Sequence, residues 1–360
     1  MTELRLTRDQ FLELQKIGIG AFAPLTGFMN EGDFHHVVSD LRLADGTVFS
    51  LPVVLDVSDD DARRLRGKPR VTLLFGDEAV GEIDPQSIFG WNREATALKV
   101  FGVVSPDHPG AAAMLRAGPQ LIGGPVRLTD AGRRFLFAEE LSPQETRLEF
   151  ARRGWSTVAG FQTRNVPHRA HEYLQRVALE LCDGLFVQPL VGRKKVGDYT
   201  PEAIMRGYKA LIGEFLPSNH VLLGVLSTSM RYAGPREALF HAIIRRNYGC
   251  THFVIGRDHA GVQSFYGKYD AHALARQYQD DIGIKLLLLH GPFHCRLCDG
   301  IATEWTCAHV VSRPDAVTEI SGTLMREMLS NATQPRPELM RPEVIAALAG
   351  TPMFVDRSDP

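Results

Sequence analysis

Apolar residues recur along this chain in two different patterns, and the change between them comes near residue 155. Upstream, short apolar runs are bounded by glycine, proline and aspartate, which is typical of strands joined by turns. Gly76-Asp77-Glu78 is expected to form such a turn, and helical periodicity is weak in this part. The predicted strands are 52–57, 70–75, 79–83 and 97–103. The pattern therefore predicts a small, mainly β domain over residues 1–150.

Downstream, apolar runs alternate with amphipathic segments, and STVAGF at 156–161 is the first strand-like run. The other predicted elements are strands at 185–191, 221–226, 251–255 and 284–289 and helices at 201–215 and 235–248. This alternation predicts an α/β domain over residues 151–318, with a parallel sheet covered by helices on both faces. Ligands of such sheets bind beyond the carboxyl ends of the strands. Prolines break up residues 319–360, which we expect to form a small helical segment.

The stretch QTRNVPHRAH at 162–171 follows the first of these strands and combines amide, guanidinium and imidazole groups. Apolar residues at helical spacing after it predict a helix, and Pro167 suits its first turn because proline lacks the N–H that is unpaired there. His168 and His171 then share one face of that turn. Helix starts favour anions through their backbone N–H groups and dipole. A polar cap with two surface histidines is the alternative, but the amide and guanidinium groups in front of them favour a polyanion site.

A second polar loop, GRDHAG at 256–261, directly follows the strand THFVI. Its two glycines let the backbone approach a ligand closely, and Arg257 and His259 offer donors to anionic oxygens. Asp258 is placed to order those donors or to bind a ribose hydroxyl. A βα turn with solvated charges is the alternative for this loop alone. Two such loops at strand ends of one sheet favour a shared anion site.

A third loop, MRYAGPRE at 230–237, adds Arg231 and Arg236 after another predicted strand. We rank Arg236 below Arg231, because Arg236 can pair with Glu237 at a helix start. The pattern of a Walker loop is missing from the sequence, so we expect no fused kinase domain.

Composition narrows the class of protein. The 360 residues carry a net charge of −2, from 40 Lys and Arg against 42 Asp and Glu, which argues against nucleic-acid or membrane-surface binding as the main activity. The start has no apolar core behind a basic stretch, and the longest apolar runs are too short to span a bilayer. Five cysteines do not suggest a disulfide framework. We therefore expect a cytoplasmic protein.

Together, QTRNVPHRAHEYL, MRYAGPREALFHAIIRRNYG, THFVIGRDHAG and ISGTLMREML resemble the ATP sulfurylase (sulfate adenylyltransferase) family, particularly its bacterial-type members. The resemblance covers essentially the whole chain. It implies a Rossmann-like nucleotidyltransferase domain, preceded by a PUA-like β domain and followed by a small helical segment. The expected reaction joins sulfate to ATP, giving adenosine 5′-phosphosulfate and pyrophosphate, with Mg²⁺ entering on ATP. A homodimer is expected from the family. Leu324 and Met325 stand where a basic residue is common.

The resemblance also assigns roles to residues at matching motif positions. Gln162 and Arg164 are expected to hold the sulfate, with the Ala260 backbone N–H closing that pocket. Thr163 and Asn165 are expected at the α-phosphate, and His168 and His171 at the β- and γ-phosphates. The expected nucleotide contacts comprise Gln162, Thr163, Asn165, His168, His171, Met230, Arg231, Gly256, Arg257, Asp258 and His259.

Three cysteines gather in Cys295-x-x-Cys298…Cys307, with His309 just beyond. The set resembles a Cys₃His structural zinc knuckle, which many bacterial-type sulfurylases carry. His309 is the doubtful ligand because an extended chain puts it about 6–7 Å from Cys307 along the backbone. His294 is the spare candidate, and cytosolic thiols without a metal are the alternative. With four protein ligands, a zinc ion is expected to be structural. We expect the remaining cysteines to pack as small apolar side chains.

Two other functions stay open from the sequence. One is a nucleotidyltransferase of the same H-x-x-H type with an acceptor other than sulfate. Arg164 argues against it, because an oxyanion pocket has no use for an uncharged acceptor. The other is an RNA-binding protein that uses the β domain and the zinc knuckle, against which the near-neutral charge counts. The sequence also leaves open whether the cell uses the forward or the reverse reaction.

Overall fold

The computed structural model describes residues 2–194, 196–262 and 264–356. The chain divides into two compact units. The first unit comprises residues 1–147, 227–249 and 258–285, and the second comprises residues 148–226, 250–257 and 286–360. The chain therefore passes between the units several times, and one of these passages lies inside the GRDHAG loop, between Arg257 and Asp258.

The first unit contains a seven-stranded sheet in which β7 is the central strand. Its strands are β1 (Glu3–Arg5), β2 (Gly27–Phe28), β3 (Leu55–Val57), β4 (Val71–Phe75), β5 (Glu78–Ile83), β6 (Ser87–Gly90) and β7 (Gln120–Leu128). β1 pairs with β4 in parallel, and β2, β3, β5 and β6 all pair with β7 in antiparallel fashion. β4 and β5 form the hairpin expected across Gly76 and Asp77.

The same unit also carries more helix than its weak periodicity predicts. Its helices are α1 (Arg8–Gly18), α2 (Glu31–Asp40), α3 (Asp59–Leu65), α4 (Arg93–Phe101), α5 (Pro109–Arg116), α6 (Asp130–Arg133), α10 (Gly234–Asn247) and α11 (Asp270–Tyr278). The strand predicted at 97–103 is wrong, because α4 covers most of it. The Asn92 side chain caps α4 at its start, and Gly102 ends it with a left-handed φ of 76°. Buried Ala97, Val100 and Phe101 recur at helical spacing. The strand prediction followed the apolar run itself and overlooked this spacing.

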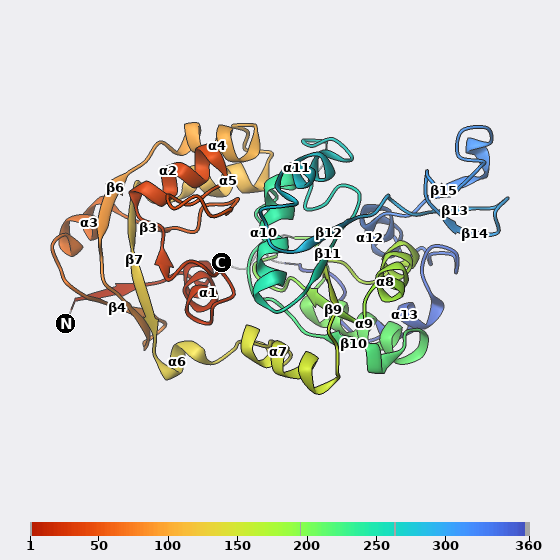
Figure 1. The fold of residues 1–360 in the computed structure, drawn as a ribbon, viewed down its shortest axis with the longest axis horizontal. Helices are drawn as coiled ribbons and strands as arrows, with labels where there is room; N and C mark the ends of the chain where they lie inside the picture. Colours follow the sequence, from red (N-terminus) through yellow and green to blue (C-terminus); the bar gives the residue numbers. More distant parts are fainter. Residues whose placement is uncertain (1, 195, 263, 357–360) are drawn as a thin grey trace. The chain divides into compact units, whose positions relative to one another are not determined.

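The second unit contains a five-stranded sheet in the order β10-β9-β8-β11-β12 (Figure 1). Its strands are β8 (Val158–Thr163), β9 (Gly184–Pro189), β10 (Val221–Leu223), β11 (His252–Ile255) and β12 (Lys285–Leu288). β8 pairs in parallel with both β9 and β11, and β9 pairs in parallel with β10. The predicted parallel sheet is thus confirmed, with boundaries shifted by one to three residues. A second, three-stranded antiparallel sheet has the order β14 (Gly300–Ala302), β13 (Phe293–Cys295), β15 (Val317–Glu319).

The remaining elements of the second unit surround these sheets. They are α8 (Arg169–Leu181), α9 (Pro201–Phe215), the 3₁₀ turns Ser218–His220 and Pro314–Ala316, β13 (Phe293–Cys295), β14 (Gly300–Ala302), β15 (Val317–Glu319), α12 (Gly322–Ser330) and α13 (Pro342–Ala347). Helix α7 (Pro143–Arg152) spans the boundary between the units at residues 147 and 148. Across the part of the chain that the structure describes, no helix combines the length and apolar character needed to cross a membrane.

One apolar core joins the five-stranded sheet to helices α8, α9, α12 and α13. Leu185 and Val187 of β9 pack in it beside Leu174 of α8. The C-terminal stretch contributes Met325 and Val344, which are fully or almost fully buried. The residues after 318 are therefore part of the packed second unit, and the division into three domains remains a prediction.

Helix α8 is fixed by one buried carboxylate. Glu172 accepts hydrogen bonds from Arg169 at 2.8 Å and from Arg176 at 3.0 Å on its own helix. Arg341, just before α13, adds two more at 2.7 and 2.8 Å. Burial raises the pKa of Glu172, but the arginines outweigh burial and hold the net pKa below the usual 4.5. The network ties the first turns of α8 to the C-terminal segment.

Replacing this carboxylate tests the network. We expect Glu172→Gln to lower the free energy of unfolding by about 2 kcal/mol at pH 7, because three guanidinium groups lose their common anion. The pKa of Glu172 is depressed, so its contribution is present above about pH 4.5 and is lost as the pH falls further. Urea denaturation at pH 7 and pH 4 measures both effects. Glu180→Gln, an exposed change on the same helix, is the control and should stay within about 0.5 kcal/mol. Equal stabilities of the two variants at pH 7 contradict the role.

Candidate active site

Strand β8 ends in a short polar segment, residues 164–168, that leads to α8. Thr163, its last residue, is buried, and its hydroxyl accepts the backbone N–H of Asn165 at 3.1 Å. Gln162 lies opposite Gln188 of β9. Gln162, Arg164 and Asn165 are all half-buried at the carboxyl edge of the sheet. The expected polar group is therefore at a strand end, where ligands of parallel sheets bind.

His168 is the N-cap of α8 and lies buried at its start. Its Nδ1 accepts the backbone N–H of His171 at 3.3 Å, so the proton of the neutral ring is on Nε2. Pro167 precedes this cap, so its predicted place in the first helical turn is wrong. The imidazole took the capping position instead, and proline fits the extended backbone before it.

His171 stacks on His168, with ring centroids 3.8 Å apart and an angle of 20° between the planes. Tyr208 of α9 brings its hydroxyl to 3.5 Å from His171 Nδ1. Burial lowers the pKa of His171 to about 4. Burial also lowers the pKa of His168 well below 6.5, and the nearby charges of His171 and Arg257 add to this effect. Both rings are therefore neutral at pH 7, and the His168 ring presents a donor.

Asn165 is held by the start of α12. Arg326 donates to the Asn165 side-chain oxygen at 3.1 Å. Gly322, the first residue of α12, approaches so closely that a Cβ there would lie 2.6 Å from Asn165 Nδ2. Arg326 also lies 3.6 Å from the buried carboxylate of Asp198. Arg326 thus supplies a basic group to the ISGT stretch, two residues after Leu324.

Lys194, beyond the carboxyl end of β9, belongs to the same cluster of charges. Its side chain is buried, with 7% of the residue exposed. Burial, opposed by Asp198 and reinforced by Arg164 and Arg326, lowers the pKa of Lys194 to about 8. Three cationic side chains and one carboxylate therefore lie within electrostatic range of one another. Their net charge of about +2 suits an anion.

Gly256 and Arg257 follow β11 at the same edge of the sheet. Arg257 donates to Glu319 at 3.2 Å and to the backbone oxygen of Ile320 at 3.4 Å. The last residues of the three-stranded sheet and the segment leading into α12 thus hold the guanidinium. Gly256 meets only ordinary contact with Leu174 where a Cβ would be added.

The rest of the GRDHAG loop belongs to the first unit. Asp258 and Ala260 both have left-handed backbone, with φ of 51° and 56°. His259 is buried, and its Nε2 lies 3.1 Å from Nδ1 of His241 on α10. The Ala260 oxygen accepts the backbone N–H of Gly234 at 3.3 Å.

Met230 and Arg231 also belong to the first unit. The Arg231 guanidinium lies over the ring of Phe240, 4.6 Å from its centroid. It also donates to Glu13 at 2.5 Å. Arg236, ranked lower from the sequence, donates to backbone oxygens of Val37 and Val38. The thirteen candidates therefore divide between the units, eight in the second and five in the first.

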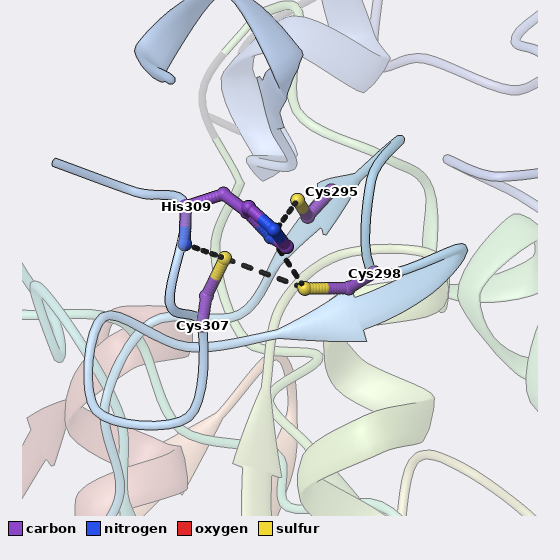
Figure 2. A group of neighbouring side chains, drawn as sticks. All are labelled: Cys295, Cys298, Cys307 and His309. Atoms are coloured by element: carbon purple, nitrogen blue, oxygen red, sulfur yellow. Dashed lines mark hydrogen bonds between the residues drawn. The ribbon is translucent and has the colours of Figure 1, made fainter. Parts of the chain in front are cut away.

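The four predicted metal ligands come together at the three-stranded sheet (Figure 2). Their ligand atoms all lie within 4.8 Å of one another. Cys298 Sγ is 3.6 Å from Cys307 Sγ, and His309 Nδ1 is 3.2 Å from Cys298 Sγ and 3.7 Å from Cys295 Sγ. A tetrahedral zinc ion separates its sulfur ligands by about 3.8 Å, given Zn–S bonds of about 2.3 Å. The set fits such an ion.

His309 reaches the cluster because the chain turns rather than extends after Cys307. Its backbone oxygen accepts the N–H of Arg313, and its own N–H donates to Cys307 Sγ at 3.4 Å. The doubt about an extended chain is thereby resolved in favour of His309, and His294 lies outside the group. Trp305, in the loop before Cys307, is 79% exposed and stacks on His290 with ring centroids 4.5 Å apart.

Comparison with known proteins identifies the family. The family model described as ATP-sulfurylase matches residues 139–350, and the one described as PUA-like domain matches residues 1–131. The chain belongs to the ATP-sulfurylase family. A sulfate adenylyltransferase from Symbiobacterium thermophilum is 45% identical over 97% of this chain and 88% of its own. Another from Hyperthermus butylicus is 42% identical over 95% of this chain and 87% of its own.

A solved structure supports the fold at lower similarity. The hexameric APS kinase from Thiobacillus denitrificans superposes with a TM-score of 0.73 over 97% of this chain, at 22% identity. This chain spans 62% of that protein's length. The expected PUA-like and α/β domains are confirmed, as are the expected family and its nucleotidyltransferase class. The roles of single residues remain predictions.

The sequence reasoning missed several groups that surround the candidates. In the second unit these are Lys194, Asp198 and Arg326. In the first unit they are His241, which contacts His259, and Glu237, which contacts His241. A signal existed for Lys194, because the basic segment GRKK follows a predicted strand, as the other two loops do.

The neutral state of His171 has a measurable consequence for stability. Its unfolded imidazole takes up a proton below about pH 6.5, whereas the folded ring does so only near pH 4. The contribution of this neutral ring is therefore present above pH 6.5 and is lost as the pH falls toward 4. We expect His171→Gln to flatten this acid-side decline of the unfolding free energy between pH 7 and pH 5. Urea denaturation at several pH values measures it, with the exposed His36→Gln as the control. Parallel curves for the variant and the unaltered protein contradict the assignment.

Proposed function

We propose that this protein transfers the adenylyl group of ATP to sulfate, forming adenosine 5′-phosphosulfate and releasing pyrophosphate, and that it also runs in reverse. The observation that carries the proposal is the carboxyl edge of the second unit's sheet. Neutral histidines open a helix there, beside a cluster of three cationic groups and one carboxylate. The names of the relatives support the same activity.

The charge of the cluster favours a dianionic acceptor. Arg164, Lys194 and Arg326 carry three positive charges, and Asp198 carries one negative charge. A sulfate ion near them balances the remaining charge of about +2. Its oxygens also accept hydrogen bonds from the cationic groups. An uncharged acceptor leaves these cations crowded without compensation. Sulfate therefore fits this cluster better than an acceptor without charge.

Within this proposal, Gln162 and Arg164 bind the sulfate, and the expected role of the Ala260 backbone N–H remains a prediction. Thr163 and Asn165 contact the α-phosphate, where Asn165 is held in place by Arg326. Sulfate has no proton to lose at neutral pH and is a weak nucleophile. The site therefore needs alignment and charge neutralisation rather than a general base.

His168 and His171 bind the β- and γ-phosphates of the departing pyrophosphate. His168 is suited to this because its Nδ1 is occupied by the helix cap, which leaves the proton on Nε2 as a donor. An anion beside these rings raises their pKa, so a second proton is gained more easily as negative charge develops. Mg²⁺ enters with ATP and is held mainly through phosphate oxygens.

The remaining candidates contact the nucleotide. We assign this role to Met230, Arg231, Gly256, Arg257, Asp258 and His259. The contacts of Arg257 with Glu319 and Ile320 orient its guanidinium. The cytoplasmic location, the homodimer and the physiological direction remain predictions.

Rates in both directions test the function. We expect pyrophosphate release from ATP to depend on added sulfate, and ATP to form from adenosine phosphosulfate and pyrophosphate. Arg164→Ala should lower kcat/KM for sulfate at least 100-fold, by about 3 kcal/mol or more, and His171→Ala should lower turnover by a similar factor with the fold intact. Arg206→Ala, an exposed change on α9, is the control. Sulfate-independent pyrophosphate release, or near-normal turnover of His171→Ala, overturns the corresponding part of the proposal.

A structural zinc ion in the Cys295, Cys298, Cys307 and His309 cluster is the second part of the proposal. We expect metal analysis to find about one zinc per chain, and less than half of that in Cys307→Ser. Chelation should lower the Tm, because the metal binds only the folded cluster. Cys250→Ser, a buried thiol outside the cluster, is the control. Less than about half a zinc per chain in the unaltered protein contradicts this assignment.

A further inference from the structure

We propose that Glu237 and His241 form a buried relay that fixes the protonated nitrogen of His259 and joins the two loops of the first unit that meet the nucleotide. Both are positioning residues, since they act through His259 and through backbone groups of residues 231–233. The inference rests on the proposed function, in which His259, Met230 and Arg231 contact the nucleotide. It extends that function to a second layer of residues.

The relay runs along α10 into the GRDHAG loop. Glu237 and His241 lie one turn apart on the helix, with side chains 0% and 1% exposed. His241 Nε2 is 3.4 Å from Glu237 Oε1, and His241 Nδ1 is 3.1 Å from His259 Nε2. The two imidazole centroids are 5.4 Å apart. Both nitrogens of His241 thus have a partner, one on each side.

The chemistry of these partners determines where the protons are. Burial raises the pKa of Glu237, but hydrogen bonds from His241 and the Arg231 backbone outweigh it, so the group is a carboxylate. Burial lowers the pKa of His241, and Arg245 and Arg231 add to this against the pull of Glu237. His241 is therefore neutral, with its one proton on Nε2 facing the carboxylate. Its Nδ1 then accepts, so Nε2 of His259 must donate.

The same carboxylate also holds the Met230–Ala233 loop. Glu237 accepts the backbone N–H of Arg231 at 2.9 Å and of Ala233 at 2.9 Å. Tyr232, between them, has a left-handed φ of 58°. Backbone of this kind persists where surrounding bonds determine it. One carboxylate thus fixes a strained loop and, through His241, the loop that carries His259.

A neutral side chain cannot replace this carboxylate without loss. Glu237 accepts three N–H groups: those of Arg231, Ala233 and His241. A glutamine turns its NH₂ toward at least one of these donors and leaves that donor unpaired. Two apolar residues would fill this interior at lower desolvation cost. We infer that Glu237 and His241 are polar because they hydrogen-bond to the two loops.

The tautomer of His259 provides a test that does not depend on activity. We expect the ¹⁵N spectrum of histidine-labelled protein at pH 8 to show His259 with its proton on Nε2. The signal is assigned by its loss in His259→Gln. In His241→Leu the acceptor is removed, so the preference for the Nε2 tautomer should weaken. A proton on Nδ1 of His259 in the unaltered protein overturns the relay, whatever the enzyme's substrate.

Kinetics test the positioning role. We expect His241→Leu and Glu237→Gln to raise KM for ATP about tenfold or more and to change KM for sulfate less than twofold. His241→Gln keeps one donor and one acceptor and should recover most of the loss. His272→Leu, a buried histidine of α11 in the same unit, is the matched control. A purely structural role lowers the active fraction and leaves both KM values unchanged.

The outcomes separate this proposal from the one on which it rests. If the unaltered protein releases no pyrophosphate on addition of sulfate, the proposed function fails, and the tautomer measurement still decides the relay. If the unaltered protein is active and the KM for ATP of a folded His241→Leu variant is unchanged, the positioning role fails and the proposed function stands.

Discussion

At the junction of β8 and α8, the His168 side chain caps the start of α8 and faces the candidate site at the same time. The His168 ring accepts an N–H of the first turn, and this bond fixes the ring's orientation and its protonated nitrogen. The strand end before it sets where Gln162 to Asn165 lie. The Glu172 network then holds the helix in place. The sheet and the helices of the second unit pack around this junction and hold it in place.

Around the junction, the fold tolerates an arrangement of charges that is unfavourable without a ligand. Arg164, Lys194 and Arg326 repel one another, and burial of Lys194 adds a desolvation cost. Asp198 offsets part of this repulsion, because it is buried and its carboxylate lies 3.6 Å from Arg326. Sites that bind anions commonly carry such cost in the empty state, because the binding energy of the ligand repays it. The crowded cations therefore favour an anionic ligand at this edge of the sheet.

The sequence predicted the elements whose signals are local. Strand–helix alternation located the parallel sheet, and the residue types at strand ends located the polar loops. Helix α4 was missed because Ala97, Val100 and Phe101 suit a strand or a helix, and only the Asn92 cap and Gly102 decide between them. Arg326 and His241 were missed for a different reason. Their partners lie 161 and 18 residues away in the chain, and spacing alone does not reveal such contacts.

The division of the chain could not be read from sequence order either. Helix α10 follows β10 as a helix of the α/β domain should, yet it clusters with the first unit. The four candidate metal ligands were the opposite case. Their spacing predicted a compact set, and only the turn at His309 needed the structure.

Trp305 gives the Cys/His cluster a property of a different kind. The indole is largely exposed, stacks on His290 and belongs to the loop that carries Cys307. Because the ring is already exposed, its emission depends mainly on the stacking with His290. The chain thus contains an intrinsic fluorophore beside a group of thiols. A rearrangement of this loop that separates Trp305 from His290 should therefore change the emission.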